Sequence, residues 1–171
     1  DFKFKKTFDK IFTKSNTYIS NSFKAAFNII KDNKISGLIN GPISKKNFLN
    51  KNFLGITEFL AHKEKKQYNV AMLIYEKTLA VSPITTHLAL KDVAKNLNKN
   101  KIINNINLIN DFYKKKIKKT PKIAVTGLNP HCESSYVSNE EKKIIIPAIK
   151  ILQKNKIIVE GPYPADTIFM P

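Results

Sequence analysis

The segment that most constrains this chain is an apolar run that ends in a stiff turn. Lys122-Ile123-Ala124-Val125 is followed directly by Thr126-Gly127-Leu128-Asn129-Pro130-His131. The apolar run predicts a buried strand, and the glycine and proline after it indicate a rigid turn. Open α/β sheets bind ligands at the carboxyl ends of their strands. His131 is therefore a candidate metal ligand or acid/base group, although a loop histidine alone is more often an ordinary solvated side chain.

The composition is that of an ordinary globular domain. The chain has 171 residues, of which 42% are hydrophobic and 25% are charged, enough for one domain with a sizeable core. Its apolar runs are too short to span a bilayer, and its first residues lack a signal-peptide pattern. The single cysteine, Cys132, excludes an intramolecular disulfide. A single cysteine fits a reducing compartment, so we expect a cytoplasmic protein. The length and composition predict no internal domain boundary.

The net charge of +17 raises the question of nucleic-acid binding. Every basic residue other than histidine is lysine, so the planar guanidinium that recognises bases and phosphates in a bidentate manner is absent. The lysines are also spread along the whole sequence, together with an excess of asparagine and isoleucine. This pattern favours the drift of an AT-rich genome over a nucleic-acid or membrane-binding function.

Hydrophobic periodicity predicts a first helix over residues 17–31, with Ser15 or Asn16 as its cap. A buried strand is expected over residues 35–40, followed at once by Gly41-Pro42-Ile43-Ser44-Lys45. The glycine would let the backbone approach a ligand closely, and Lys45 could offer a positive charge to a phosphate. This loop is too short for a Walker A motif.

The remainder of the chain alternates between predicted strands and helices. Thr57 is placed to cap a helix, and residues 69–75 and 78–84 form a predicted antiparallel hairpin. A helix is expected over residues 101–118, and a capping box at residues 138–141 precedes another helix. A last strand is expected over residues 157–159. The fold class is therefore α/β, with one antiparallel pair.

Three polar side chains follow predicted strands. They are His87, His131 and Asp166, which could all meet at one edge of the sheet. Two imidazoles and a carboxylate suit zinc or another divalent metal, although the irregular spacing alone leaves two unrelated loop histidines as the more common case. Cys132 is a poor nucleophile candidate, because it neighbours His131 on a turn and such residues point apart. A glycine-rich dinucleotide fingerprint is absent from the sequence.

Taken together, the motifs resemble the 4-hydroxythreonine-4-phosphate dehydrogenase family of pyridoxal 5'-phosphate biosynthesis. The matching blocks occur in the family's order and at about its spacing. They are Gly41-Pro42-Ile43-Ser44-Lys45, Thr57-Glu58-Phe59-Leu60, Thr85-Thr86-His87-Leu88 with Asp92-Val93, Gly127-Leu128-Asn129-Pro130-His131, and Gly161-Pro162-Tyr163-Pro164-Ala165-Asp166-Thr167.

The resemblance implies a two-domain α/β fold similar to the isocitrate and isopropylmalate dehydrogenases, a homodimer, and a site near the subunit interface. His87 and His131 match two of the family's three metal-binding histidines, and Thr57 matches a substrate-binding threonine. Asp166 and Lys45 match residues of the catalytic site. The implied cofactors are a divalent metal (zinc, magnesium or cobalt) and NAD or NADP, with metal-assisted hydride transfer followed by decarboxylation of a β-keto acid.

The sequence departs from the family pattern in three ways. Ile56 stands where the family has histidine, the loop after His131 lacks the family's glycines, and the part with the third metal histidine is missing. We therefore expect an internal fragment that is inactive by itself. The alternatives are a dehydrogenase of another four-carbon acid phosphate, a lysine-rich nucleic-acid-binding module, and a stable domain without catalytic activity.

Overall fold

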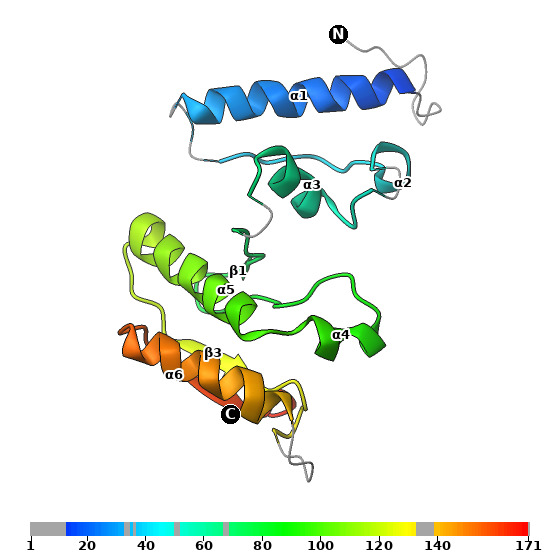
Figure 1. Ribbon diagram of the computed structural model, residues 1–171. Helices are drawn as coiled ribbons and strands as arrows, with labels where there is room; N and C mark the ends of the chain where they lie inside the picture. Colours follow the sequence, from blue (N-terminus) through cyan, green and yellow to red (C-terminus); the bar gives the residue numbers. More distant parts are fainter. Residues whose placement is uncertain are drawn as a thin grey trace. The chain divides into compact units, whose positions relative to one another are not determined.

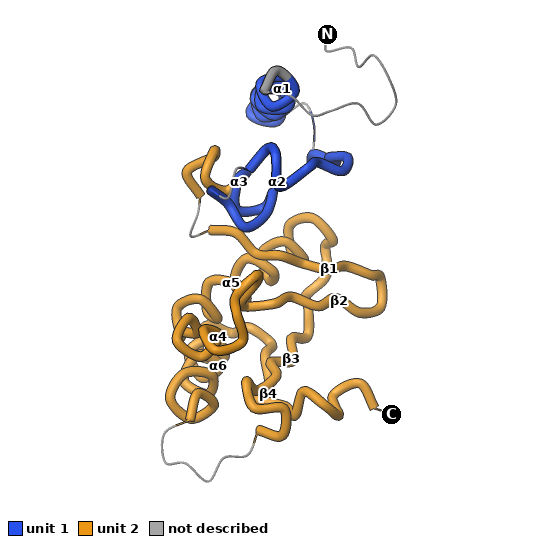
Figure 2. Tube along the Cα trace, turned by 90° about the vertical axis from the view of Figure 1, so that its right-hand side faces the viewer, with its two compact units in different colours: residues 1–60 blue, residues 61–171 orange. Residues whose placement is uncertain are grey.

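A computed structural model describes residues 13–32, 35, 37–49, 52–66, 69–132 and 139–170. The chain divides into two compact units, residues 1–60 and 61–171, which Figure 2 distinguishes by colour. The sequence predicts no boundary at this division, because composition and charge do not change visibly there. Within the described residues, none of the helices has the length and apolar character needed to cross a membrane.

The first unit is built around a small aromatic cluster. Helix α1 (Thr13–Lys31) contributes Phe23, α2 (Lys45–Phe48) contributes Phe48, and α3 (Ile56–Lys63) contributes Phe59. The Phe48 and Phe59 rings meet edge to face with their centroids 5.0 Å apart, and the ring centroid of Phe23 lies 5.7 Å from that of Phe59. Edge-to-face contacts of this kind add to the free energy gained by burying the rings. The helical stripe expected on residues 17–31 thus forms part of this core.

Three sequence predictions for the first unit are wrong in detail. Residues 37–44 belong to neither sheet of the described chain, and Ile39 is 99% exposed, because no described strand pairs with them. Helix α1 starts before its expected cap, and the Asn16 amide instead donates to the Asn47 carbonyl at 2.9 Å. Thr57 lies inside α3, because the helical hydrogen bond from Phe59 N already reaches Gly55 O.

The second unit holds the larger core and a short parallel sheet. Strand β3 (Ile123–Thr126) pairs in parallel with β4 (Val159–Tyr163), and α6 (Ile146–Lys154) packs on β4 and on α5 (Lys99–Phe112) (Figure 1). Single π-helical turns extend α5 (η1, Tyr113–Ile117) and precede α6 (η2, Glu141–Ile145). The buried core residues are Leu97, Ile102, Ile106, Ile145, Ala148, Ile149, Leu152, Ile157 and Val159.

The predicted antiparallel hairpin is confirmed, although its strands are shorter than expected. Strand β1 (Ile74–Tyr75) pairs with β2 (Ala80–Val81), and α4 (Leu90–Asn96) follows further along the chain. This pair and the β3–β4 pair form two separate sheets in the described part of the chain. The expectation of one shared sheet edge for all three site residues is therefore wrong. The α/β class itself is confirmed.

The hairpin turn contains a carboxylate with a strongly lowered pKa. The hydroxyl and the backbone N–H of Thr78 both donate to Glu76, and these hydrogen bonds lower the pKa of its carboxyl from 4.5 to about 2. The charged form is thus favoured in the folded state, so the turn is stabilised above the unfolded pKa and loses this contribution as pH falls through about 2.

Replacing Thr78 with alanine removes the hydroxyl, which is the largest cause of this shift. We expect the pKa of Glu76 to rise toward 4.5 in this variant, while the backbone hydrogen bond keeps it below that value. Carboxyl ¹³C chemical shifts followed through an acid titration measure both pKa values. A pKa near 4.5 for Glu76 in the unsubstituted chain would contradict the turn geometry.

Candidate functional site

His131 and Asp166 meet at the carboxyl ends of β3 and β4. The two strands are parallel, so the segments that follow them leave the sheet at the same edge. His131 Nδ1 lies 2.8 Å from Asp166 Oδ2, and the two side chains are 71% and 37% exposed. A carboxylate on Nδ1 fixes the tautomer and the orientation of an imidazole. In this pair, the oriented His131 imidazole can act as a metal ligand or a base.

Backbone hydrogen bonds join the two segments that carry this pair. Gly127 N donates to Tyr163 O at 3.0 Å, and Ala165 N donates to Pro130 O at 2.7 Å. Within the turn, His131 N donates to the Asn129 side-chain oxygen at 3.1 Å. These bonds bring Pro130 and Ala165, the residues before His131 and Asp166, into direct contact. The local backbone therefore determines where the exposed imidazole lies.

Gly161 allows β4 to run close to β3. Its φ is +129°, and a Cβ at this position would overlap the carbonyl oxygen of Val125. The register of the pair shifts between Ala124 and Thr126, opposite this glycine. The sequence placed Gly161 in a loop after a strand ending at Val159, and this boundary is wrong because β4 continues to Tyr163. The close approach of the strands is what brings Asp166 to the same edge as His131.

The chemistry of Cys132 does not favour a nucleophile. Burial raises the pKa of its thiol, the Glu141 and Asp166 carboxylates raise it further, and the Gly127 backbone N–H lowers it in part. A neutral thiol is a weak nucleophile. Cys132 also has a φ of +56°, an uncommon backbone conformation for a residue other than glycine.

His87 is exposed and lies after β2, on a turn of its own where its φ is +58°. Strand β2 belongs to the other sheet, and the described residues contain no group of three or more His, Cys, Asp or Glu side chains that could hold a metal ion. His87, His131 and Asp166 therefore do not form one cluster. That His87 and His131 both bind a metal remains a prediction.

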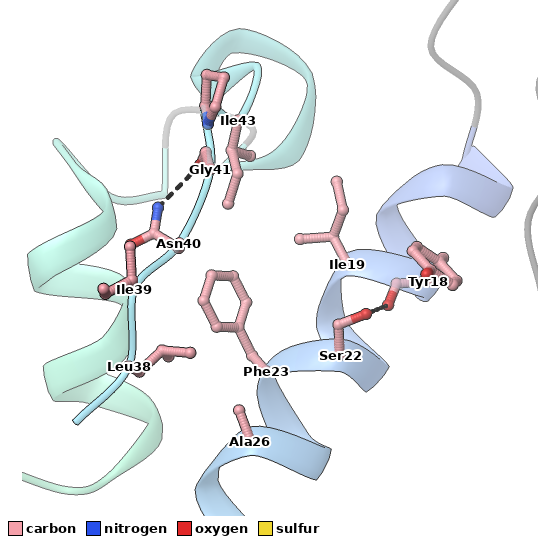
Figure 3. Close-up of a pocket in the computed structure, with 11 residues that line it drawn as sticks. Tyr18, Ile19, Ser22, Phe23, Ala26, Leu38, Ile39, Asn40, Gly41 and Ile43 are labelled. Carbon is pink, nitrogen blue, oxygen red and sulfur yellow. Dashed lines mark hydrogen bonds between the residues drawn. The ribbon is translucent and has the colours of Figure 1, made fainter. Parts of the chain in front are cut away.

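Lys45 and Thr57 belong to the first unit. Lys45 is the first residue of α2, Thr57 is in the first turn of α3, and both side chains are exposed. This unit contains an apolar hollow of about 270 Å³. Figure 3 shows Ile19 and Phe23 of α1 extending toward residues 38–43, which also line it. Lys45 and Thr57 are not among its lining residues. The hollow is therefore separate from the predicted substrate contacts.

Glu141 contacts the histidine turn, which is the turn of residues 127–131 that carries His131, in a way that the sequence did not indicate. Its Ser-x-x-Glu spacing predicts a capping-box residue, but its Oε1 accepts a hydrogen bond from Asn129 N at 2.8 Å. Asn139 caps the helical segment instead, because its side-chain oxygen accepts from Lys142 N at 2.8 Å. Ser138, the expected partner of the capping box, lies outside the described residues.

Comparisons with known proteins agree along almost the whole chain. The model of the family described as pyridoxal phosphate biosynthetic protein PdxA matches residues 2–171. A 4-hydroxythreonine-4-phosphate dehydrogenase of Sulfurihydrogenibium is 40% identical over 157 residues, which are 89% of this chain and 47% of that protein. A Neisseria meningitidis enzyme of the same name is 41% identical over 137 residues, which are 79% of this chain and 40% of that enzyme.

Solved structures show the same relationship. A 4-hydroxythreonine-4-phosphate dehydrogenase from Klebsiella pneumoniae superimposes with a TM-score of 0.73 at 30% identity, over 85% of this chain and 46% of that one. A Salmonella typhimurium protein assigned to the same enzyme superimposes with a TM-score of 0.83 at 28% identity, over 94% of this chain and 50% of that one. The chain spans about half the length of these relatives. The chain belongs to the family of the pyridoxal phosphate biosynthetic protein PdxA.

Proposed function

We propose that this chain carries part of the active site of an oxidoreductase that converts 4-phosphooxy-L-threonine to a β-keto acid, which decarboxylates to 3-amino-2-oxopropyl phosphate. The family match and the names of its relatives support this class of reaction. The single observation that carries it is the His131–Asp166 pair, 2.8 Å apart at the carboxyl edge of a parallel sheet. A fold similar to the isocitrate and isopropylmalate dehydrogenases and a homodimer belong to the same proposal.

The geometry of His131 fits one ligand of a divalent metal. Asp166 occupies its Nδ1, which leaves Nε2 as the nitrogen that can coordinate an ion, and histidine ligands usually carry such a carboxylate on their other nitrogen. The family resemblance names His87 as a second ligand, although His87 forms no cluster with His131 and Asp166 in the described residues. The described residues do not complete a coordination sphere, so further donors would come from outside them.

The chemistry divides between cofactors and side chains. A divalent metal would stabilise the developing alkoxide of the substrate, and NAD or NADP would accept the hydride as the C–H bond of the alcohol breaks. Thr57 would hold the substrate, and the Lys45 ammonium would attract its anionic groups. Asp166 would keep the His131 imidazole in one tautomer and orientation. This chain alone is expected to form no NADH.

A chimera tests the proposal directly. The 157 matched residues of the Sulfurihydrogenibium relative would be replaced by those of this chain, so that the remaining parts of the active site are present. We expect the chimera to reduce NAD or NADP with 4-phosphooxy-L-threonine and a divalent metal, measured as absorbance of the reduced nicotinamide. His131→Ala in the chimera should lower this rate by about 100-fold or more, because the oriented imidazole is lost.

The control is His62→Ala, which removes an exposed histidine of α3 that the proposal does not use. This variant should keep the rate of the chimera. A folded chimera that binds NAD but does not oxidise the substrate would refute the proposal, as would full activity in the His131→Ala variant. NADH formed by the unfused chain would show that the expected inactivity is wrong.

A second substrate is favoured by one residue. Ile56, the first residue of α3, replaces a polar contact that the family resemblance places beside Thr57. A site that hydrogen-bonds its substrate discriminates strongly against analogues that leave its polar groups unpaired, and an isoleucine removes one such constraint. The alternative is therefore oxidation of another four-carbon acid phosphate. A panel of such acids given to the chimera distinguishes the two by their kcat/KM values.

A further inference from the structure

Glu141 is a carboxylate in an unusual place. Glu141 is the first residue of η2, and only 3% of it is exposed. Acidic residues are almost never this buried unless a partner compensates for the lost solvation. Its partner is the backbone amide of Asn129, whose N–H donates to Oε1 at 2.8 Å, and the described residues form no ion pair with it. The contact therefore compensates part of the cost of burying this carboxylate.

The residue that Glu141 holds is the centre of the histidine turn. The Asn129 side-chain oxygen accepts from His131 N at 3.1 Å, and its carbonyl oxygen accepts from Cys132 N at 2.9 Å. Gly127 leaves room for this arrangement, because a Cβ there would lie 3.2 Å from Glu141 Oε1 and 2.5 Å from Cys132 Sγ. Glu141 and the turn thus pack directly against each other.

The imidazole itself gains little support from packing. The His131 side chain is 71% exposed, and a solvent-exposed pair of this kind is only weakly stabilising by itself. The 2.8 Å contact with Asp166 therefore depends on where the backbone of the turn lies. That backbone is joined to β4 at Pro130 and to η2 at Asn129.

We propose that Glu141 is a positioning residue that holds the turn at Asn129 so that His131 Nδ1 meets Asp166. This inference rests on the proposed function only in that it concerns the same histidine. Glu141 Oε1 is a buried hydrogen-bond acceptor that holds the backbone of the turn at Asn129. The turn then presents the exposed His131 imidazole to Asp166, which fixes its tautomer.

The test uses the whole 171-residue chain and needs no substrate, cofactor or metal. Long-range ¹H–¹⁵N spectra of the histidine side chains, recorded where the imidazoles are neutral, show which ring nitrogen of His131 carries the proton. We expect the proton on Nδ1 in the unsubstituted chain. Asp166→Ala, which removes the partner carboxylate, should abolish this signature and so calibrates the measurement.

Two variants separate the acceptor from the charge and the size of the side chain. Glu141→Gln keeps an oxygen that can accept from Asn129 N, and we expect it to retain the Nδ1–H signature. Glu141→Met has a similar length without an acceptor, and we expect it to lose the signature. Glu140→Gln, which removes a charge from the neighbouring and less buried residue, is the matched control and should change nothing.

A folded Glu141→Met variant that keeps the Nδ1–H signature would overturn the proposal, and so would its loss in Glu141→Gln. If Glu141→Met does not fold, amide hydrogen exchange in the unsubstituted chain decides instead. Slow exchange of the Asn129 N–H, faster in Glu141→Gln because a neutral acceptor is weaker, supports the proposal. Rapid exchange in the unsubstituted chain refutes it. An inactive chimera with an intact Nδ1–H signature would refute the proposed function alone.

Discussion

Replacing Gly161 with alanine is expected to lower the free energy of unfolding of the second unit by about 3 kcal/mol or more. The φ of Gly161 is +129°, a backbone conformation that residues with a Cβ rarely adopt. The added methyl group would overlap the carbonyl oxygen of Val125, which is backbone and cannot move aside as a flexible side chain could. Strand β4 would have to separate from β3, and the buried Val159 would lose part of its packing.

Urea denaturation followed by circular dichroism measures this loss. Gly37→Ala is the matched control, because a Cβ at Gly37 would meet nothing within 4 Å and its φ is not in the left-handed region. That variant should change the free energy of unfolding by less than about 1 kcal/mol. Equal stability of the Gly161→Ala variant and the unsubstituted chain would show that the two strands do not approach as closely as described.

Replacing Asp166 with asparagine in the chimera is expected to lower the activity and the affinity for the divalent metal by about 10- to 100-fold. The substitution keeps the size of the side chain but removes the negative charge beside His131 Nδ1. The imidazole then loses the partner that selects its tautomer and its orientation. Both side chains are well exposed, so the free energy of unfolding should change by less than about 0.5 kcal/mol.

Steady-state rates across a range of metal concentrations give the activity and the metal affinity, and a thermal melt of each variant gives the change in stability. Asp111→Asn is the control, because Asp111 pairs with Lys115 on the exposed side of α5, at 2.8 Å. It removes the same charge away from the site and should leave the rate and the metal affinity unchanged. Unchanged metal affinity in the Asp166→Asn variant would remove Asp166 from the proposed site.

Local patterns in the sequence predicted the elements that depend on neighbouring residues. Apolar residues at helical spacing located α1 and α5, and the two short apolar runs around Glu76 located the hairpin. The apolar run before Thr126 located β3, and the stiff turn after it identified His131 as a candidate site residue. The motifs also identified the family without reference to the fold, and the family match confirms this.

Predictions that required a partner distant in the sequence were less accurate. Residues 37–40 have the composition of a buried strand, yet Ile39 is 99% exposed because no described strand pairs with it. Gly161 and Pro162 are typical of a turn, yet they lie in β4, where close contact with Val125 requires a residue without a Cβ. A strand is defined by what pairs with it, and periodicity carries no information about that partner.

The candidate site shows the same division. The sequence alone determined the family, the α/β class and the stiff turn that carries His131, because these depend on residue types and on spacings within short segments. Only the tertiary structure decided that Asp166 rather than His87 lies beside His131, and that Glu141 lies behind the turn at Asn129. These contacts depend on the parallel pairing of β3 with β4 and on the position of η2, which bring together segments that the sequence keeps apart.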